Sequence, residues 1–266
     1  MYELAQLDSL LHIISRTGAI LVGGQAVNFW SERYQKEAEP WTSSRPFTSV
    51  DVDLLGNQTD ARTCAEATGG ELELPDDPAH TPNTAKVHCR HPDVDIDVLH
   101  TVNGLNTAEA TQTAVRLRYG SIPLRVLHPV LCVESKTVNL ITLDQSVEGR
   151  QDEKHLRLSI ANCAEFLREL THKGRAPARL IRWAERLRTH ASSQAGLEVQ
   201  RKYRLQFLDG VPLEFWNEPT GPLRHWVQHE SPRWRVEVEQ KLHDLEDLGR
   251  WMRDLKQHRG SPPSAT

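Results

Sequence analysis

The sequence lacks several features that mark common classes of protein. Its 266 residues contain no Cys-x-x-Cys pair, because the four cysteines (Cys64, Cys89, Cys132 and Cys163) stand far apart. Such spacing is typical of free thiols in a reducing cytosol rather than of a disulfide framework or a zinc site. No apolar run is long enough to cross a bilayer, and the first residues do not join a basic region to an apolar core. We therefore expect a cytoplasmic protein without membrane contact.

Excess positive charge is also missing. The chain has 32 Lys and Arg against 36 Asp and Glu, a formal net charge of −4. A polyanion such as nucleic acid would therefore have to bind a local basic patch rather than the molecule as a whole. The 13 histidines are scattered without zinc-ligand spacing, so we interpret them as ordinary surface or core residues.

Carboxylates, by contrast, are concentrated in two short segments that hold five aspartates. Ser49-Val-Asp-Val-Asp-Leu-Leu55 comes first, and Pro92-Asp-Val-Asp-Ile-Asp-Val-Leu99 follows. In a strand, residues two apart face the same side, so Asp51 projects with Asp53 and Asp95 with Asp97. Carboxylates crowded in this way repel one another unless a cation lies between them, and oxygen ligands suit Mg²⁺. The pattern indicates metal-assisted phosphoryl or nucleotidyl chemistry, and the alternative is a solvated acidic hairpin.

The first part of the chain mixes predicted helices and strands. Gly23-Gly24 stands between a predicted strand and a predicted helix, which is the organisation of a turn where a phosphate can approach the backbone. Residues 39–47 and 71–82 are predicted to be irregular. The other predicted elements are helices at 4–14, 25–34, 59–68 and 107–117 and strands at 19–22, 49–55, 85–89, 94–101 and 122–126.

From residue 128 onward the pattern is helical, with helices predicted at 130–143, 152–172, 177–191 and 236–258. Residues 212–232 are predicted to be an ordered, irregular connection, and the tail at 260–266 to be disordered. We therefore predict an α+β fold, a mixed sheet flanked by helices and followed by a helical C-terminal domain. The predicted domains are residues 1–127, residues 128–259 and the tail 260–266.

Three segments, taken in order, resemble the DNA polymerase β-like nucleotidyltransferase superfamily. Leu21-Val-Gly-Gly-Gln-Ala-Val-Asn-Phe-Trp30 resembles its glycine signature, Thr48-Ser-Val-Asp-Val-Asp-Leu54 its paired-carboxylate strand, and Ile96-Asp-Val-Leu99 the strand of its third carboxylate. More narrowly, the chain is similar to the bacterial branch of abortive-infection and toxin-type nucleotidyltransferases. The resemblance covers roughly residues 18–170.

The resemblance implies a nucleotidyltransferase-like site that binds a nucleoside triphosphate and two Mg²⁺ ions, with Mn²⁺ as a substitute. Asp51 and Asp53 are expected to hold the ion on the triphosphate, and Asp97 to complete the second metal position and serve catalysis. Strand parity alone leaves Asp95 and Asp97 open as the third carboxylate. The superfamily strand favours Asp97, and Asp95 remains a candidate metal ligand.

Five further residues are expected to contact the nucleotide, in addition to Gly23. They are Gly24, Ser49, Lys136, Arg150 and Asp152. Two departures concern the substrate more than the chemistry: many members have Gly-Ser where this chain has Gly23-Gly24, and the 27 residues from Gly24 to Asp51 (51 − 24) exceed the usual spacing.

A basic stretch precedes and includes the predicted helix at 177–191. It is either an ordinary solvated face or the surface for a nucleic-acid acceptor. Its cationic residues are Lys173, Arg175, Arg179, Arg182, Arg186 and Arg188.

The sequence thus predicts a magnesium-dependent, ATP- or other NTP-binding nucleotidyltransferase. It would move a nucleoside monophosphate to a hydroxyl of tRNA, other RNA or protein. The resemblance favours the toxin of a toxin–antitoxin or phage-defence system, with a cognate antitoxin as partner. The alternatives are a transferase acting on a small, aminoglycoside-like molecule and a catalytically silent binding or antitoxin-like protein of the same fold.

Overall fold

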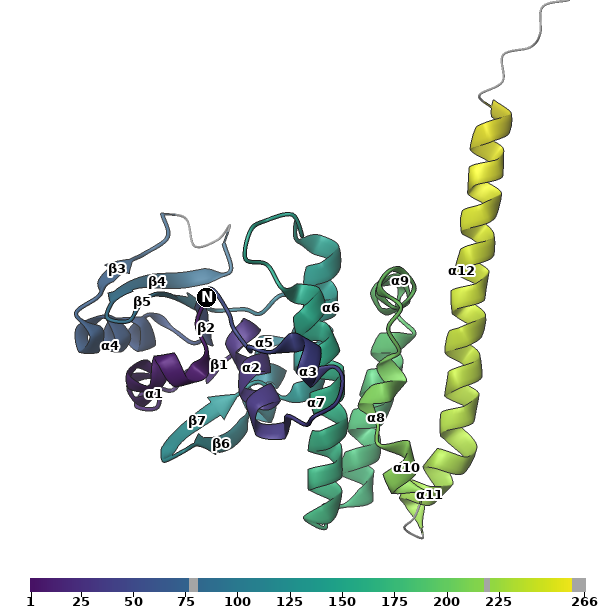
Figure 1. Ribbon diagram of the computed structural model, residues 1–266, viewed down its shortest axis with the longest axis horizontal. Helices are drawn as coiled ribbons and strands as arrows, with labels where there is room; N and C mark the ends of the chain where they lie inside the picture. The colour runs from purple at the N-terminus through teal and green to yellow at the C-terminus, as the bar shows by residue number, and fades with distance from the viewer. Residues whose placement is uncertain (77–80, 218–220, 260–266) are drawn as a thin grey trace, which may run out of the picture. The chain divides into compact units, whose positions relative to one another are not determined.

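The computed structural model describes residues 1–76, 81–217 and 221–259 and has an α+β fold (Figure 1). Its strands form a seven-stranded mixed sheet in the order β3-β4-β5-β2-β1-β7-β6. The strands are β1 (Ile20–Leu21), β2 (Val52–Leu55), β3 (Glu71–Glu73), β4 (Asn83–Arg90), β5 (Asp93–Leu99), β6 (Val115–Tyr119) and β7 (Ile122–Val126).

The chain divides into two compact units. The first comprises Met1–Gly174 with Asp209–Pro212, and the second Arg175–Leu208 with the chain from Leu213 onward. The helices of the first unit are η1 (Leu4–Leu7), α1 (Asp8–Ile14), α2 (Gly23–Tyr34), α3 (Trp41–Ser44), α4 (Gln58–Thr68), α5 (Thr107–Thr113), α6 (Pro129–Thr142) and α7 (Asp152–His172).

Parallel pairing at the centre of the sheet brings the two acidic segments together. Strands β2 and β5 are parallel, with Asp53 opposite Asp97. Strand β1 is antiparallel to β2, so the chain leaves β1 for Gly23 next to the start of β2. The bond from the Val22 N–H to the Asp53 carbonyl, 3.0 Å long, fixes this junction.

The two faces of the sheet differ: helix α4 packs on one, and the acidic side chains project from the other. Helix α4 packs on β4, where Ala85 and Val87 are buried and Cys89 contacts Thr68 of α4 at 3.7 Å. Asp97 has the opposite parity to the buried Ile96 and Val98, so it projects from the other face. The period-two alternation of β5 therefore separates an apolar core from an acidic surface, as its sequence predicts.

Helices α2, α6 and α7 pack against one another in the first unit. Buried hydrogen bonds join them to their surroundings: Trp30 of α2 donates to the Leu127 carbonyl at 2.9 Å, and Asn162 of α7 donates to Ser31 of α2 at 2.9 Å. Leu131 of α6 and Phe166 of α7 also belong to the core that contains the buried strand residues, so both helices lie with the sheet. The compact units divide after Gly174, whereas the sequence analysis placed a boundary at residue 127.

In the second unit the described residues form helices and turns. Glu185 of α8 accepts hydrogen bonds from Trp226 at 2.6 Å and from Arg188 at 2.6 Å, and Arg188 also bonds Glu237 at 3.2 Å. The elements are α8 (Pro177–Ala191), α9 (Gln194–Tyr203), η3 (Phe207–Gly210, which continues into the first unit), α10 (Leu213–Trp216), α11 (Pro222–His225), η4 (Trp226–Glu230) and α12 (Ser231–Arg259).

Several predicted elements need correction. The helix predicted at 107–117 ends at Thr113, and strand β6 begins at Val115. The segments predicted to be irregular contain α3, β3, α10 and α11, and α9 was not predicted. The predicted disordered tail at 260–266 lies outside the described residues, as do residues 77–80 of the predicted irregular segment.

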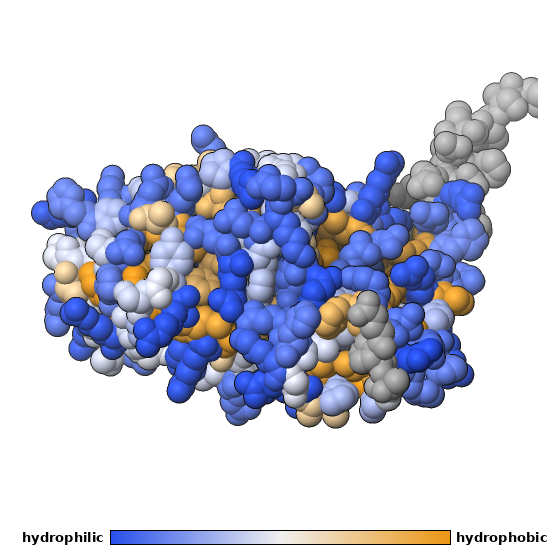
Figure 2. Space-filling model, turned by 60° about the horizontal axis from the view of Figure 1, so that its bottom comes forward, coloured by the Kyte–Doolittle hydropathy of each residue, from blue (hydrophilic) through white to orange (hydrophobic). Residues whose placement is uncertain are grey.

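Hydrophilic residues make up most of the face that Figure 2 draws, and hydrophobic residues show between them. No helix in the described ranges combines the length and the apolar character that a membrane crossing requires.

Candidate metal and nucleotide site

Three carboxylates converge where β1, β2 and β5 meet. Asp53 lies on β2, Asp97 faces it on β5, and Asp51 lies just before β2 begins. One oxygen from each of the three lies within 4.8 Å of the other two. Carboxylate oxygens at this spacing can coordinate one divalent cation in common, and their number fits a hard ion such as Mg²⁺.

The glycine turn packs directly against this cluster. Gly23 has φ +59°, and a β-carbon added there would lie 1.8 Å from Asp53 Oδ2. A β-carbon on Gly24 would lie 2.4 Å from Ser49 Oγ, and Ser49 Oγ also lies 3.3 Å from Asp51 Oδ1. Only glycine can occupy position 23 without displacing the Asp53 carboxylate. The turn thus places the N-terminus of α2 beside the acidic cluster.

Crowding and burial disfavour the ionised carboxylates when no cation is bound. Burial raises the pKa of Asp53 to about 7; Asp51 adds to this shift, and Lys136 opposes it. Burial likewise raises the pKa of Asp97, an effect that Lys86 opposes. Burial and neighbouring carboxylates thus outweigh the nearby lysines in the metal-free fold. A bound cation would stabilise the ionised forms.

Asp95 has different partners, although it shares a strand face with Asp97. Its two oxygens bond His88 Nδ1 at 2.8 Å and Lys86 Nζ at 2.9 Å. Burial would raise the pKa of Asp95, but the bonds from Lys86 and His88 outweigh this and hold it below its usual value. Among the described residues, Asp95 does not belong to the convergent group. Its carboxylate is instead paired with Lys86 and His88.

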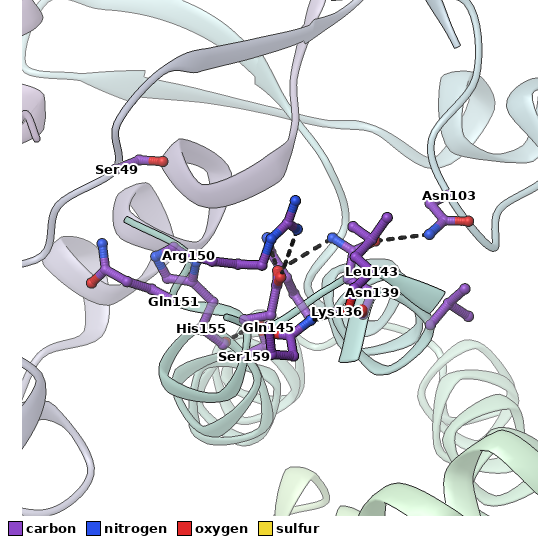
Figure 3. A network of polar contacts seen from close by, with 12 residues as sticks. Ser49, Asn103, Lys136, Asn139, Leu143, Gln145, Arg150, Gln151, His155 and Ser159 are labelled. Carbon is purple, nitrogen blue, oxygen red and sulfur yellow. Dashed lines mark hydrogen bonds and ion pairs between the residues drawn. The ribbon is translucent and has the colours of Figure 1, made fainter. Parts of the chain in front are cut away.

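Lys136 of α6 lines the same site and is held by a buried ion pair. Its Nζ bonds Asp152 Oδ1 at 2.8 Å, and Asn139 and Arg150 also bond Asp152, at 3.3 and 3.2 Å (Figure 3). Burial opposes ionisation of Asp152, but Lys136 and these bonds lower its pKa to about 2. Asn103 bonds the Asn139 side-chain oxygen at 3.0 Å, which leaves the amide nitrogen of Asn139 for Asp152.

Two residues at the site were missed by the sequence analysis. Asn83 donates to Asp97 Oδ1 at 3.1 Å. His155 is 3% exposed, bonds the Thr48 backbone, and has no partner for Nε2 among the described residues. Burial lowers its pKa to about 3, so the imidazole is neutral. The signal for His155 was its place one helical turn after Asp152.

These elements surround one cleft in the first unit, with a volume of about 1220 Å³. Its lining brings together every site residue predicted from the sequence except Asp95. The predicted residues in the lining are Gly23, Gly24, Ser49, Asp51, Asp53, Asp97, Lys136, Arg150 and Asp152. The cleft therefore offers cation ligands on one wall and a buried lysine on another.

A comparison with protein-family models finds no match for this chain, and neither does a comparison with curated proteins.

Proposed function

We propose that this protein is a metal-dependent nucleotidyltransferase with a fold of the DNA polymerase β-like type. The observation that supports this best is the convergence of Asp51, Asp53 and Asp97 within 4.8 Å, directly against the Gly23 turn. A helix N-terminus can bind phosphate through its free N–H groups. Cation ligands beside such a turn suit a nucleoside triphosphate, because its phosphates bind both a metal ion and N–H donors.

The donor set fits Mg²⁺, with Mn²⁺ as a substitute. Asp51 and Asp53 would hold the ion that accompanies the triphosphate, and Asp97 would complete a second position. Bound there, two ions would neutralise charge on the phosphates and lower the pKa of an acceptor hydroxyl. Asp95, paired with Lys86 and His88, would not be needed as a ligand.

The protein's own groups then have distinct roles. The α2 N-terminus and the bare backbone of Gly23 and Gly24 would contact the phosphates, and Lys136 would offset their negative charge. Asp152 would position Lys136 through their 2.8 Å bond. Arg150 and Ser49 would be accessory contacts.

The reaction would be an in-line displacement at the α-phosphorus. A bond forms between the acceptor oxygen and the α-phosphorus, the bond to the β-phosphate bridging oxygen breaks, and pyrophosphate leaves. The acceptor proton would pass to the Asp97 carboxylate, which lies beside the position of the acceptor-side ion.

The acceptor that we favour is a hydroxyl of RNA, tRNA included, with a protein side chain as the second possibility. A toxin role would add a cognate antitoxin as partner. A small aminoglycoside-like acceptor or a silent binding protein would give a different result in the transfer experiment below.

Calorimetry tests the metal site first. Titration with Mg²⁺ or Mn²⁺ in the presence of each nucleoside triphosphate should show binding to the natural protein, and Asp53→Asn should abolish it. Asp95→Asn is the matched control, because it removes a carboxylate charge from the same sheet face outside the cluster. Equal binding by Asp53→Asn would refute the assignment.

Transfer is tested by incubation with each α-labelled nucleoside triphosphate, Mg²⁺ and total RNA or lysate. Label on RNA supports the favoured acceptor, and label on a polypeptide supports protein. Label on neither, with normal triphosphate binding, would favour a small-molecule acceptor or the silent protein.

A further inference from the structure

A second surface of the first unit carries unbalanced positive charge. Strands β6 and β7 form an antiparallel ribbon at the edge of the sheet (Figure 1), and Arg116 of β6 lies directly opposite Arg125 of β7. Arg118 is two residues further along β6 and so shares their face. We call these three residues the arginine face. The sequence analysis missed it because 107–117 was predicted to be helical.

The described residues provide no ion-pair partner for the arginine face. Within the described part of the chain, none of its three guanidinium groups forms an ion pair, whereas Arg33, Arg45 and Arg157 each pair with a glutamate. Like charges directly opposite one another on a sheet are destabilising. Three such arginines without an ion-pair partner among the described residues form a surface suited to an external anion.

Local hydrogen bonds fix part of this surface. Arg125 donates to the carbonyls of Gly18 at 2.6 Å and Thr111 at 3.0 Å, and Arg118 donates to the Ser121 carbonyl at 3.2 Å. Arg116 and Arg118 are exposed. The three arginines line a groove of about 510 Å³, with Ser15 and Thr17 also in its lining. The charges therefore border a concave surface rather than an isolated convex face.

We propose that the arginine face binds the phosphate backbone of a single-stranded RNA, the acceptor of the transfer reaction. Guanidinium groups bind phosphates in a bidentate manner. The groove lies near the N-terminal end of β1, because Arg125 contacts Gly18 just before that strand. The cleft lies near the C-terminal end of β1, where Gly23 follows the strand. Five residues of extended chain span roughly 16 Å, so one RNA of a few nucleotides can contact both.

The inference rests on the proposed function, which requires a hydroxyl-bearing acceptor, but its test does not require the chemistry. The probe is a fluorescein-labelled 12-nucleotide RNA, and binding is followed by anisotropy in EDTA without triphosphate at 50 to 200 mM KCl. Arg116→Ala/Arg118→Ala removes the two exposed guanidinium groups and leaves Arg125 in place. Arg45→Ala/Arg157→Ala is the matched control, because it removes the same charge from paired positions.

The natural protein should bind the probe and lose affinity with salt. Loss of two phosphate contacts should reduce the slope of log affinity against log salt by about 1.4, so the natural protein should lose about sevenfold more affinity than the arginine-face variant over this fourfold salt range. The control should keep the natural slope. Arg116→Lys/Arg118→Lys keeps the charge and should keep most of the slope, which separates charge from packing.

Two results would overturn the inference: no binding of the probe by the natural protein at 50 mM KCl, or equal salt slopes for the natural protein and Arg116→Ala/Arg118→Ala. Such a protein would need another partner, an acidic protein among them. RNA binding by the arginine face without label on RNA or polypeptide would contradict the proposed RNA acceptor and favour a small-molecule acceptor or the silent protein. It would leave this surface standing as an RNA-binding site.

Discussion

At the scale of single residues, the distinction between Asp95 and Asp97 depends on their partners. The two carboxylates alternate on one strand, so sequence periodicity cannot separate them. In the structure, Lys86 and His88 on β4 bond Asp95, while Asn83 bonds Asp97 and leaves it near Asp51 and Asp53. Cross-strand register, which the sequence does not encode locally, makes the difference.

We predict that Asp97→Asn reduces turnover by roughly 10²- to 10³-fold, because several kcal/mol of charge stabilisation at the acceptor side is lost. Triphosphate binding by calorimetry should stay largely intact. Asp95→Asn should keep turnover within a few-fold, since Asp95 lies outside the convergent group. Initial rates of transfer measure both, and a reversed order would show that Asp95 is the third carboxylate.

At the scale of the glycine turn, Gly23 and Gly69 provide a matched pair. Both have positive φ (59° and 61°), but an added β-carbon meets Asp53 at Gly23 and nothing within 4 Å at Gly69. We predict that alanine at Gly69 costs about 1 kcal/mol of backbone strain, a shift in Tm of about 2–4 °C. Alanine at Gly23 should cost more, because its β-carbon must also displace Asp53. Gly23→Ala alone should also lose Mg²⁺-triphosphate affinity in calorimetry. Equal affinity in the two variants would mean that the turn does not set the cluster geometry.

The pair that joins α6 to α7 provides a third prediction. Asp152→Asn removes the carboxylate that bonds the buried Lys136, which we expect to cost about 3–5 kcal/mol in the free energy of unfolding. The double variant Lys136→Met/Asp152→Asn should recover much of this loss, because the buried lysine is then absent and Arg150, which also loses its bond to Asp152, is partly exposed. Urea denaturation of the natural protein and of all the variants, Lys136→Met included, completes the cycle. Additive losses would argue against the pair as a unit.

Secondary structure was predictable from the sequence where the apolar residues follow a single spacing, either that of a helix or that of a strand. Helices α7 and α8 have the predicted bounds, and β7 was predicted at 122–126. Strand β6 was not, because its apolar residues Val115 and Leu117 continue a pattern that also suits a helix. The sheet gains β6 only through pairing with β7. Here tertiary pairing overrode a local pattern.

At the scale of the whole molecule, the division of the chain was the least predictable feature. Helical periodicity in α6 and α7 shows that each helix has a buried side but not what covers it. Leu131 of α6 and Phe166 of α7 belong to the same buried core as residues of the strands, which places both helices with the sheet. This arrangement completes the site, because Lys136 and Asp152 come from α6 and α7 and Asp53 comes from the sheet.

The response of the whole fold to pH and cation provides the last prediction. The pKa of Asp53 is about 7 in the metal-free fold against a usual 3.8. Between these values the folded state binds a proton that the unfolded state lacks, so this group's contribution to stability is present below about pH 4 and is lost as the pH rises through 7. Cation binding requires the ionised carboxylate and must displace that proton.

The affinity for Mg²⁺ should therefore rise by about tenfold per pH unit below 7 and level off above it. Melting curves at pH 5.5 to 8.5, with Mg²⁺ or with EDTA, measure this as a difference in Tm that grows from pH 6 to pH 8, since a ligand stabilises the fold by RT ln(1 + [L]/Kd). In Asp53→Asn the difference should vanish at every pH, whereas Asp95→Asn should follow the natural protein. A Tm difference independent of pH would mean that the cation binds without displacing a proton from this cluster, and the site would then have to be sought among groups already ionised in the metal-free fold.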